Sequence, residues 1–170
     1  MRIRLDHPSS YTEGEIAITG SKSESNRFLI LQALFPQIII KNISNSDDSK
    51  ITENALKSTD SIIDIHHAGT AMRFLTAYFS TQPGREIILT GSQRMQERPI
   101  KLLVDALKYL GAEISYDKKE GYPPLKIIGK KIIKSKVALQ ANISSQYISA
   151  LMLIAPSLEN GLTIELEGQL

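Results

Sequence analysis

The chain has 170 residues, of which 42% are hydrophobic and 22% are charged, a composition typical of a globular protein with a substantial core. A net charge of only +2 excludes a strongly basic nucleic-acid-binding arm, and the absence of cysteine excludes disulfides, thiolate metal sites and a cysteine nucleophile. No apolar run reaches the roughly 20 residues of a membrane span, and the first residues do not resemble a signal peptide, so we expect a cytoplasmic protein.

Short segments that are rich in isoleucine, or that alternate between apolar and polar residues, predict β-strands along the whole chain. In chain order they are Arg2–Leu5, Glu15–Thr19, Ile38–Ile43, Ile62–Ile65, Glu86–Thr90, Glu113–Tyr116, Leu125–Ile128, Lys136–Leu139 and Leu162–Leu166.

Helices are predicted between these strands. Three are apolar on nearly every side and should therefore be buried on all sides; they open at Ser21-Lys22-Ser23, Gly69-Thr70 and Ser144-Ser145-Gln146. An amphipathic helix from about Pro99 to Leu110 places Ile100, Leu103, Val104, Leu107 and Leu110 on one face, with Gly111 as its stop. A weaker helix is expected at Lys50–Ser58.

The order strand, helix, strand, helix, strand, strand occurs more than once, and it suggests two units at about Gly20–Ile88 and Leu89–Leu166. Helices that are apolar all round need cover on every side. The sequence therefore predicts an α/β (α+β) fold with helices inside and sheets outside, the reverse of a doubly wound fold.

The three apolar helices begin with small, hydroxyl-bearing and cationic residues. A helix start carries free N–H groups and about half a positive charge, and Lys22 and Arg27 add two full charges near the first of them. If the three starts converge, the chain is built to hold several negative charges together. The first is not a nucleotide-binding phosphate loop, because Ser21 and Ile16 stand where that motif requires glycine.

Each motif also has a simpler structural interpretation. In that interpretation the serines and Asn26 merely cap helices, Gly69 merely forms a turn, and Arg94 merely pairs with Glu97 in a solvated loop. In the functional interpretation, Arg94 makes a bidentate contact with a carboxylate or phosphate. The hydroxyls of Ser144 and Ser145, together with the N–H groups of the helix start, bind a phosphate. Arg27, at the edge of an apolar helical run, needs a specific anionic partner, and Arg73, which also enters an apolar helix, needs a partner. His66 and His67 are adjacent on a predicted strand, where side chains point to opposite faces, so we interpret them as structural.

Taken together, the motifs resemble those of the 5-enolpyruvylshikimate-3-phosphate (EPSP) synthase family from about Thr19 onward. In family order these are Gly20-Ser21-Lys22-Ser23 with Asn26-Arg27, Ala68-Gly69-Thr70-Ala71-Met72-Arg73, Arg94-Met95 with Glu97-Arg98-Pro99-Ile100, Leu103-Val104-Asp105-Ala106-Leu107, Pro123-Pro124-Leu125 and Ser144-Ser145-Gln146-Tyr147. Related UDP-N-acetylglucosamine enolpyruvyl transferases would show Lys-Asn near the start and usually a loop cysteine.

The resemblance implies an inverted α/β barrel of repeated βαβαββ units and an enolpyruvyl transfer from phosphoenolpyruvate to the 5-hydroxyl of shikimate 3-phosphate, with release of phosphate and without metal or organic cofactor. By motif, Lys22 would lie between the substrates as a catalytic residue. Ser23, Arg27, Ser144, Ser145 and Gln146 would bind shikimate 3-phosphate, and Gly69, Arg94 and Gln146 would bind phosphoenolpyruvate. Two positions depart from the family pattern: Phe74 stands where proline is common, and His67 stands where asparagine is common.

The resemblance also implies a longer enzyme. We expect residues 1–19 to be a strand segment that joins a second domain, and residues 20–170 to be the first two units of one barrel domain. The rest of the enzyme would supply the carboxylate that deprotonates the 5-hydroxyl and further cations, so we expect this chain to be inactive alone. The alternative is a non-catalytic anion-binding module that has kept the fold. No nucleic-acid or membrane partner is expected.

Overall fold

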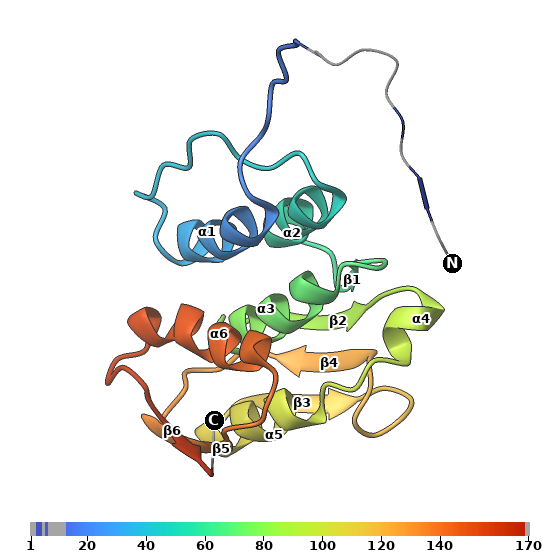
Figure 1. Ribbon diagram of the computed structural model, residues 1–170. Helices are drawn as coiled ribbons and strands as arrows, with labels where there is room; N and C mark the ends of the chain where they lie inside the picture. The colour runs from blue at the N-terminus through green and yellow to red at the C-terminus, as the bar shows by residue number, and fades with distance from the viewer. Residues whose placement is uncertain (1–2, 5, 7–12, 169–170) are drawn as a thin grey trace.

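The computed structural model describes residues 3–4, 6 and 13–168 (Figure 1). The helices are α1 (Lys22–Leu34), α2 (Asp47–Lys57), α3 (Gly69–Ser80), α4 (Gln93–Gln96), α5 (Lys101–Leu110) and α6 (Ser145–Ile154), followed by a 3₁₀ turn, η1 (Ala155–Ser157). The strands are β1 (Ile62–Asp64), β2 (Glu86–Thr90), β3 (Glu113–Tyr116), β4 (Leu125–Ile128), β5 (Lys136–Gln140) and β6 (Thr163–Glu167).

Four strands form one sheet in the order β1-β2-β4-β3. β1 runs parallel to β2, with Ile63 opposite Leu89, and β4 pairs antiparallel with both β2 and β3. The chain from β1 to β4 thus makes one βαβαββ unit. The predicted unit boundary at Ile88–Leu89 is wrong, because it falls inside β2.

β5 and β6 form a second, parallel pair, in which Val137 lies opposite Ile164. They are joined through α6, just as β1 and β2 are joined through α3. The strand–helix–strand arrangement that opens the first sheet is therefore repeated at the second.

α3 is the central helix of the fold. Ten of its twelve residues are buried, and it packs against α1, α2, α5, α6 and the sheet strands β2 and β4. Figure 1 shows it between the sheet and the helices α1, α2 and α6. The predicted arrangement of a helix inside with a sheet outside is confirmed for α3, and its two residues that are not fully buried, Thr70 and Arg73, lie near its start.

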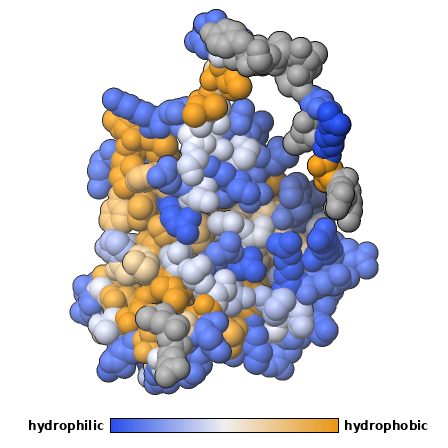
Figure 2. Space-filling view, in the orientation of Figure 1, coloured by the Kyte–Doolittle hydropathy of each residue, from blue (hydrophilic) through white to orange (hydrophobic). Residues whose placement is uncertain are grey.

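The prediction that α1 and α6 are buried on every side is wrong. Only Ser25, Asn26, Leu29 and Ile30 of α1 are buried, while Phe28 is 45% exposed and Met152 of α6 is 60% exposed. Both helices carry apolar residues around their whole circumference, yet among the described residues only one side of each is covered. Figure 2 shows apolar surface gathered on the left of the view, where α1 and α6 end in Figure 1.

Two predicted strands do not form. In Glu15–Thr19 the side chains of Ile16 and Ile18 are exposed, and the segment pairs with no other strand in the part of the chain that is described. The segment Ile38–Ile43 instead follows α1, where the side-chain amide of Gln32 donates to the carbonyl of Ile38. An alternating pattern makes a strand only where a partner strand accepts its backbone hydrogen bonds. Of the strand predicted at Arg2–Leu5, Ile3 and Arg4 are described and do not lie in a strand, whereas Arg2 and Leu5 lie outside the described residues.

The remaining predicted elements form with small shifts at their ends, and the short helix α4 forms where the sequence predicted a loop. The predicted apolar face of α5 is buried, and Gly111 ends the helix in the left-handed conformation with φ 116°. α2 begins three residues earlier than predicted, because the side chain of Ser46 accepts a hydrogen bond from the backbone N–H of Ser49 at 3.4 Å and caps the helix.

Candidate functional site: a pocket at four helix starts

The starts of α1, α3 and α6 converge, which meets the condition for a shared anion site. They line one pocket of about 560 Å³, to which α1 contributes Lys22, α3 contributes Gly69 and Thr70, and α6 contributes Ser144, Ser145 and Gln146. α2 adds Asp48 from its first turn, so four helix starts meet there. His67, Arg73 and Arg98 complete the lining. Five of the eight predicted site residues are thus brought together.

The helix starts differ in how their N–H groups are satisfied. Ser21 caps α1 by accepting from the backbone N–H of Glu24, so the capping interpretation holds there. Neither Ala68 before α3 nor Ser144 before α6 makes a side-chain capping bond. The first N–H groups of α3 and α6 therefore remain available to an anion.

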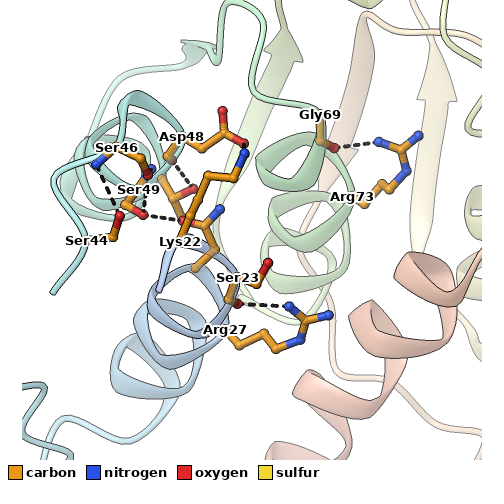
Figure 3. Close-up of polar contacts among 11 residues, drawn as sticks. Lys22, Ser23, Arg27, Ser44, Ser46, Asp48, Ser49, Gly69 and Arg73 are labelled. Atoms are coloured by element: carbon orange, nitrogen blue, oxygen red, sulfur yellow. Dashed lines mark hydrogen bonds and ion pairs between the residues drawn. The ribbon is translucent and has the colours of Figure 1, made fainter. Parts of the chain in front are cut away.

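Lys22 faces a carboxylate across the pocket. Its Nζ lies 3.7 Å from Oδ2 of Asp48, and the Asp48 side chain is the less exposed of the two (Figure 3). Asp48 is the single carboxylate in the lining, against the cations Lys22, Arg73 and Arg98. The pocket carries a net positive charge and is suited to anions.

Arg73 folds back over the start of its own helix. Its Nη1 donates to the carbonyl of Gly69 at 2.6 Å, and its guanidinium lies 5.5 Å from the ring centroid of Tyr147 on α6 (Figure 3). Its Nε is buried and has no hydrogen-bond partner. Arg73 thus brings positive charge to the junction of α3 and α6.

Gly69 occupies a crowded position. A Cβ atom built there would lie 2.6 Å from Nη1 of Arg98 and 3.2 Å from Nη1 of Arg73. The missing side chain leaves room for two guanidinium groups above the backbone of the helix start.

Ser23 and Arg27 lie beside the pocket and are not part of its lining. Arg27 donates to the carbonyl of Ser23 at 2.9 Å and to the hydroxyl of Ser149 at 3.4 Å, and its guanidinium lies 5.3 Å from the ring centroid of Phe74. These contacts link α1, α3 and α6, but none of the groups is anionic, so the anionic partner predicted for Arg27 is not found among the described residues. Its contact with a ligand stays a prediction.

Arg94 is exposed on α4, and it does not line the pocket. Within the described residues no ion pair joins Glu97 to Arg94 or to Arg98, so the simple Arg–Glu pair considered above does not form. The contact of Arg94 with an anion stays a prediction, whereas Arg98, four residues later, reaches the pocket.

The two histidines do not lie on a strand. They form a turn after β1, in which His66 has a positive φ of 51° and the Nδ1 atoms of the two rings are 3.0 Å apart. The expectation that their side chains point to opposite faces is wrong, because the turn brings the rings together. His67 also lines the pocket.

Five residues that were not predicted as site residues also line the pocket: Asp48, His67, Thr70, Arg73 and Arg98. Arg73 carried a usable signal, since a charged residue entering an apolar helix needs a partner. Arg98 stands in a motif of the family resemblance and Asp48 in none, but the sequence does not show their proximity to Gly69 and Lys22, because it depends on how distant segments pack.

The chain matches the family profile of EPSP synthase (3-phosphoshikimate 1-carboxyvinyltransferase) over residues 50–170. It is 48% identical over 171 residues to the 3-phosphoshikimate 1-carboxyvinyltransferase of Bacteroides fragilis strain YCH46, covering 100% of this chain and 41% of the relative. It is 40% identical to the corresponding protein of Mannheimia haemolytica, covering 96% of this chain and 44% of that one. The chain therefore spans less than half the length of these relatives.

The structure is similar to that of an EPSP synthase from Acinetobacter baumannii, with a TM-score of 0.75 and 22% sequence identity over 92% of this chain and 42% of the other. At this identity the likeness concerns the fold. Among the described residues, no helix is long and apolar enough to cross a lipid bilayer.

Proposed function

Because this chain belongs to the EPSP synthase family, we propose that it forms part of an enzyme that transfers the enolpyruvyl group of phosphoenolpyruvate to the 5-hydroxyl of shikimate 3-phosphate. The observation that carries this proposal is the convergence of uncapped helix starts and three cations on one pocket. Both substrates carry a phosphate and a carboxylate, so the reaction needs a site that holds several negative charges side by side.

In the proposed reaction, the 5-hydroxyl gives its proton to a carboxylate supplied by the remaining portion of the enzyme, its oxygen bonds to C2 of phosphoenolpyruvate, and C3 accepts a proton. The tetrahedral intermediate then loses phosphate from C2 and a proton from C3, which leaves an enolpyruvyl ether. A lysine ammonium between the substrates would stabilise the negative charge that develops as the enolpyruvyl group is transferred. This is the role that we assign to Lys22. Uncapped N–H groups at α3 and α6 are already oriented and need no reorganisation during the reaction.

The substrates divide between the helix starts. We assign the 3-phosphate of shikimate 3-phosphate to Ser144 and Ser145, the ring and carboxylate to Ser23 and Arg27, and phosphoenolpyruvate to the backbone at Gly69 together with Arg94. Gln146, at the start of α6, would lie between the two. No step in this assignment requires a metal or organic cofactor. The partners are the two substrates and the remaining portion of the same enzyme, in the cytoplasm.

The test joins residues 1–170 to the portion of the Bacteroides fragilis relative that follows the matched region. We expect this chimera to release phosphate only when both substrates are present, and Lys22→Gln to abolish the release. Lys41→Gln, which removes an exposed charge outside the pocket, is the control and should leave turnover intact. The 170-residue chain alone should stay at background. A folded chimera that binds shikimate 3-phosphate without turnover would favour the anion-binding module instead.

A further inference from the structure

Arg98 is the pocket cation for which no partner is found among the described side chains. Arg73 donates to Gly69 and Lys22 faces Asp48, whereas no hydrogen bond or ion pair from the guanidinium of Arg98 occurs in the described part of the chain. Its Nη1 nevertheless lies 2.6 Å from the position of a Cβ on Gly69. A guanidinium without a partner among the described residues thus lies beside an uncapped helix start.

The backbone around Arg98 is anchored to the pocket from two sides. The N–H of Arg98 donates to the carbonyl of Met95 at 3.1 Å, which fixes it to the end of α4. The next carbonyl, that of Pro99, accepts a hydrogen bond from the hydroxyl of Tyr147 at 2.7 Å. Tyr147 is buried on α6 two residues after Ser145, so the position of Arg98 is tied to the start of α6.

From this geometry we propose that Arg98 is an anion-binding residue of the pocket, and that Gly69 lacks a side chain in order to admit its guanidinium over the start of α3. The ligand is a phosphate or carboxylate group bound jointly by the fork of Arg98 and the first N–H groups of α3. The inference rests on the proposed function in one respect, because that function identifies this anion as phosphoenolpyruvate.

In this arrangement the missing side chain of Gly69 has a second role, beyond leaving the backbone of the helix start open to the anion. A methyl group on residue 69 would meet the tip of a flexible, exposed side chain, which can move away at little cost to folding. The substitution Gly69→Ala would then weaken anion binding mainly by displacing Arg98. Its effect must therefore depend on whether Arg98 is present.

The experiment is a double-mutant cycle of Gly69→Ala and Arg98→Ala in the 170-residue chain, read by calorimetric titration with inorganic phosphate and with phosphoenolpyruvate. We expect each single variant to weaken binding about tenfold, and the double variant to bind no more than about threefold more weakly than Arg98→Ala. Arg98→Lys should fall between wild type and Arg98→Ala, because lysine keeps the charge but loses the fork. Lys118→Gln, which removes a charge beside α4 but outside the pocket, should bind like wild type.

The outcomes separate the two proposals. Wild-type binding by Arg98→Ala, or an equal penalty for Gly69→Ala in both backgrounds, would overturn the role of Arg98. Failure of either ligand to bind the wild-type chain would overturn it as well. The expected cycle with phosphate, combined with a chimera that does not turn over, would leave Arg98 as an anion ligand and remove the proposed enzymatic function.

Discussion

Lys22 and Asp48 face each other across the pocket with 3.7 Å between Nζ and Oδ2, although 26 residues separate them in the chain. The pairing places a carboxylate in a pocket otherwise lined by cations and helix starts. Asp48 therefore competes with any bound anion for Lys22 while keeping the lysine ammonium at the pocket.

The first prediction follows from this competition. Asp48→Asn should strengthen the binding of inorganic phosphate about fivefold, because removing one negative charge near a partly exposed anion is worth ~1 kcal/mol. Asp47→Asn is the matched control: Asp47 lies in the same first turn of α2 but is exposed and outside the pocket lining. Calorimetric titration at low salt would measure both, and equal changes in the two variants would contradict a local effect.

The second prediction concerns Arg94 in the chimera described above. Arg94→Lys should impair the use of phosphoenolpyruvate by at least about 2 kcal/mol, with much less effect on the binding of shikimate 3-phosphate, if its fork holds a buried anion. Steady-state kinetics with each substrate varied would measure the difference. Arg85→Lys is the control, since Arg85 bonds the backbone carbonyls of Ser58 and Thr59 outside the pocket. Equal losses for both substrates would indicate a structural arginine.

The third prediction concerns the polar groups buried between α1 and the segment before α2. The hydroxyl of Ser25 accepts a hydrogen bond from the N–H of Ser44 at 2.9 Å, and both residues are buried. Ser25→Ala leaves that N–H without a partner, so we expect the free energy of unfolding to fall by about 1–3 kcal/mol. Ser23→Ala, two residues earlier on the exposed side of the same helix, should change it by less than about 0.5 kcal/mol. Urea denaturation would distinguish them, and similar midpoints for the two variants would refute the buried contact.

The fourth prediction concerns Gly20, just before α1. A Cβ atom there would collide with the backbone carbonyl of Asn42, which cannot move aside as a flexible side chain can. Gly20→Ala should therefore destabilise the fold by about 1–3 kcal/mol through overpacking. Gly14 has nothing within 4 Å of its Cβ position, so Gly14→Ala is the control and should be neutral. A Gly20→Ala protein as stable as wild type would mean that the 42–45 segment is free to shift.

Local patterns were sufficient to predict most elements. β2, β3 and β4 form with the predicted bounds, because each alternates between the two faces of a sheet and finds a partner strand. Ile38–Ile43 shows that the pattern is not enough. Its backbone and that of the residues after it bond instead to side chains of α1, such as Gln32 and Ser25, and a pattern confined to the segment cannot reveal this.

The candidate site, like the fold, was predictable from the sequence only in part. The helix starts indicated a shared anion site only on the condition that they converge, and the family resemblance implied that Lys22, Gly69 and Ser144–Gln146 bind the same two substrates; the structure brings these residues to one pocket. The position of Arg98 over Gly69 was not predictable, because it depends on the turn after α4 and on the bond from Tyr147 to Pro99. The contact between His66 and His67 also required the structure, since a positive φ at a non-glycine residue is uncommon.

The meeting of four helix starts at one pocket has a consequence for the melting temperature. Helix dipoles add about half a positive charge at each start, and Lys22, Arg73 and Arg98 increase it, with Asp48 as the single opposing carboxylate. Mutual repulsion at this end of the molecule opposes folding, and an anion that binds only the folded chain relieves it. By linkage, an anion at 100 times its dissociation constant adds about 2.7 kcal/mol to the stability. The protein should therefore melt at a higher temperature in phosphate buffer than in a buffer of equal ionic strength that contains only chloride. The difference between the two melting temperatures then reports anion binding in the pocket.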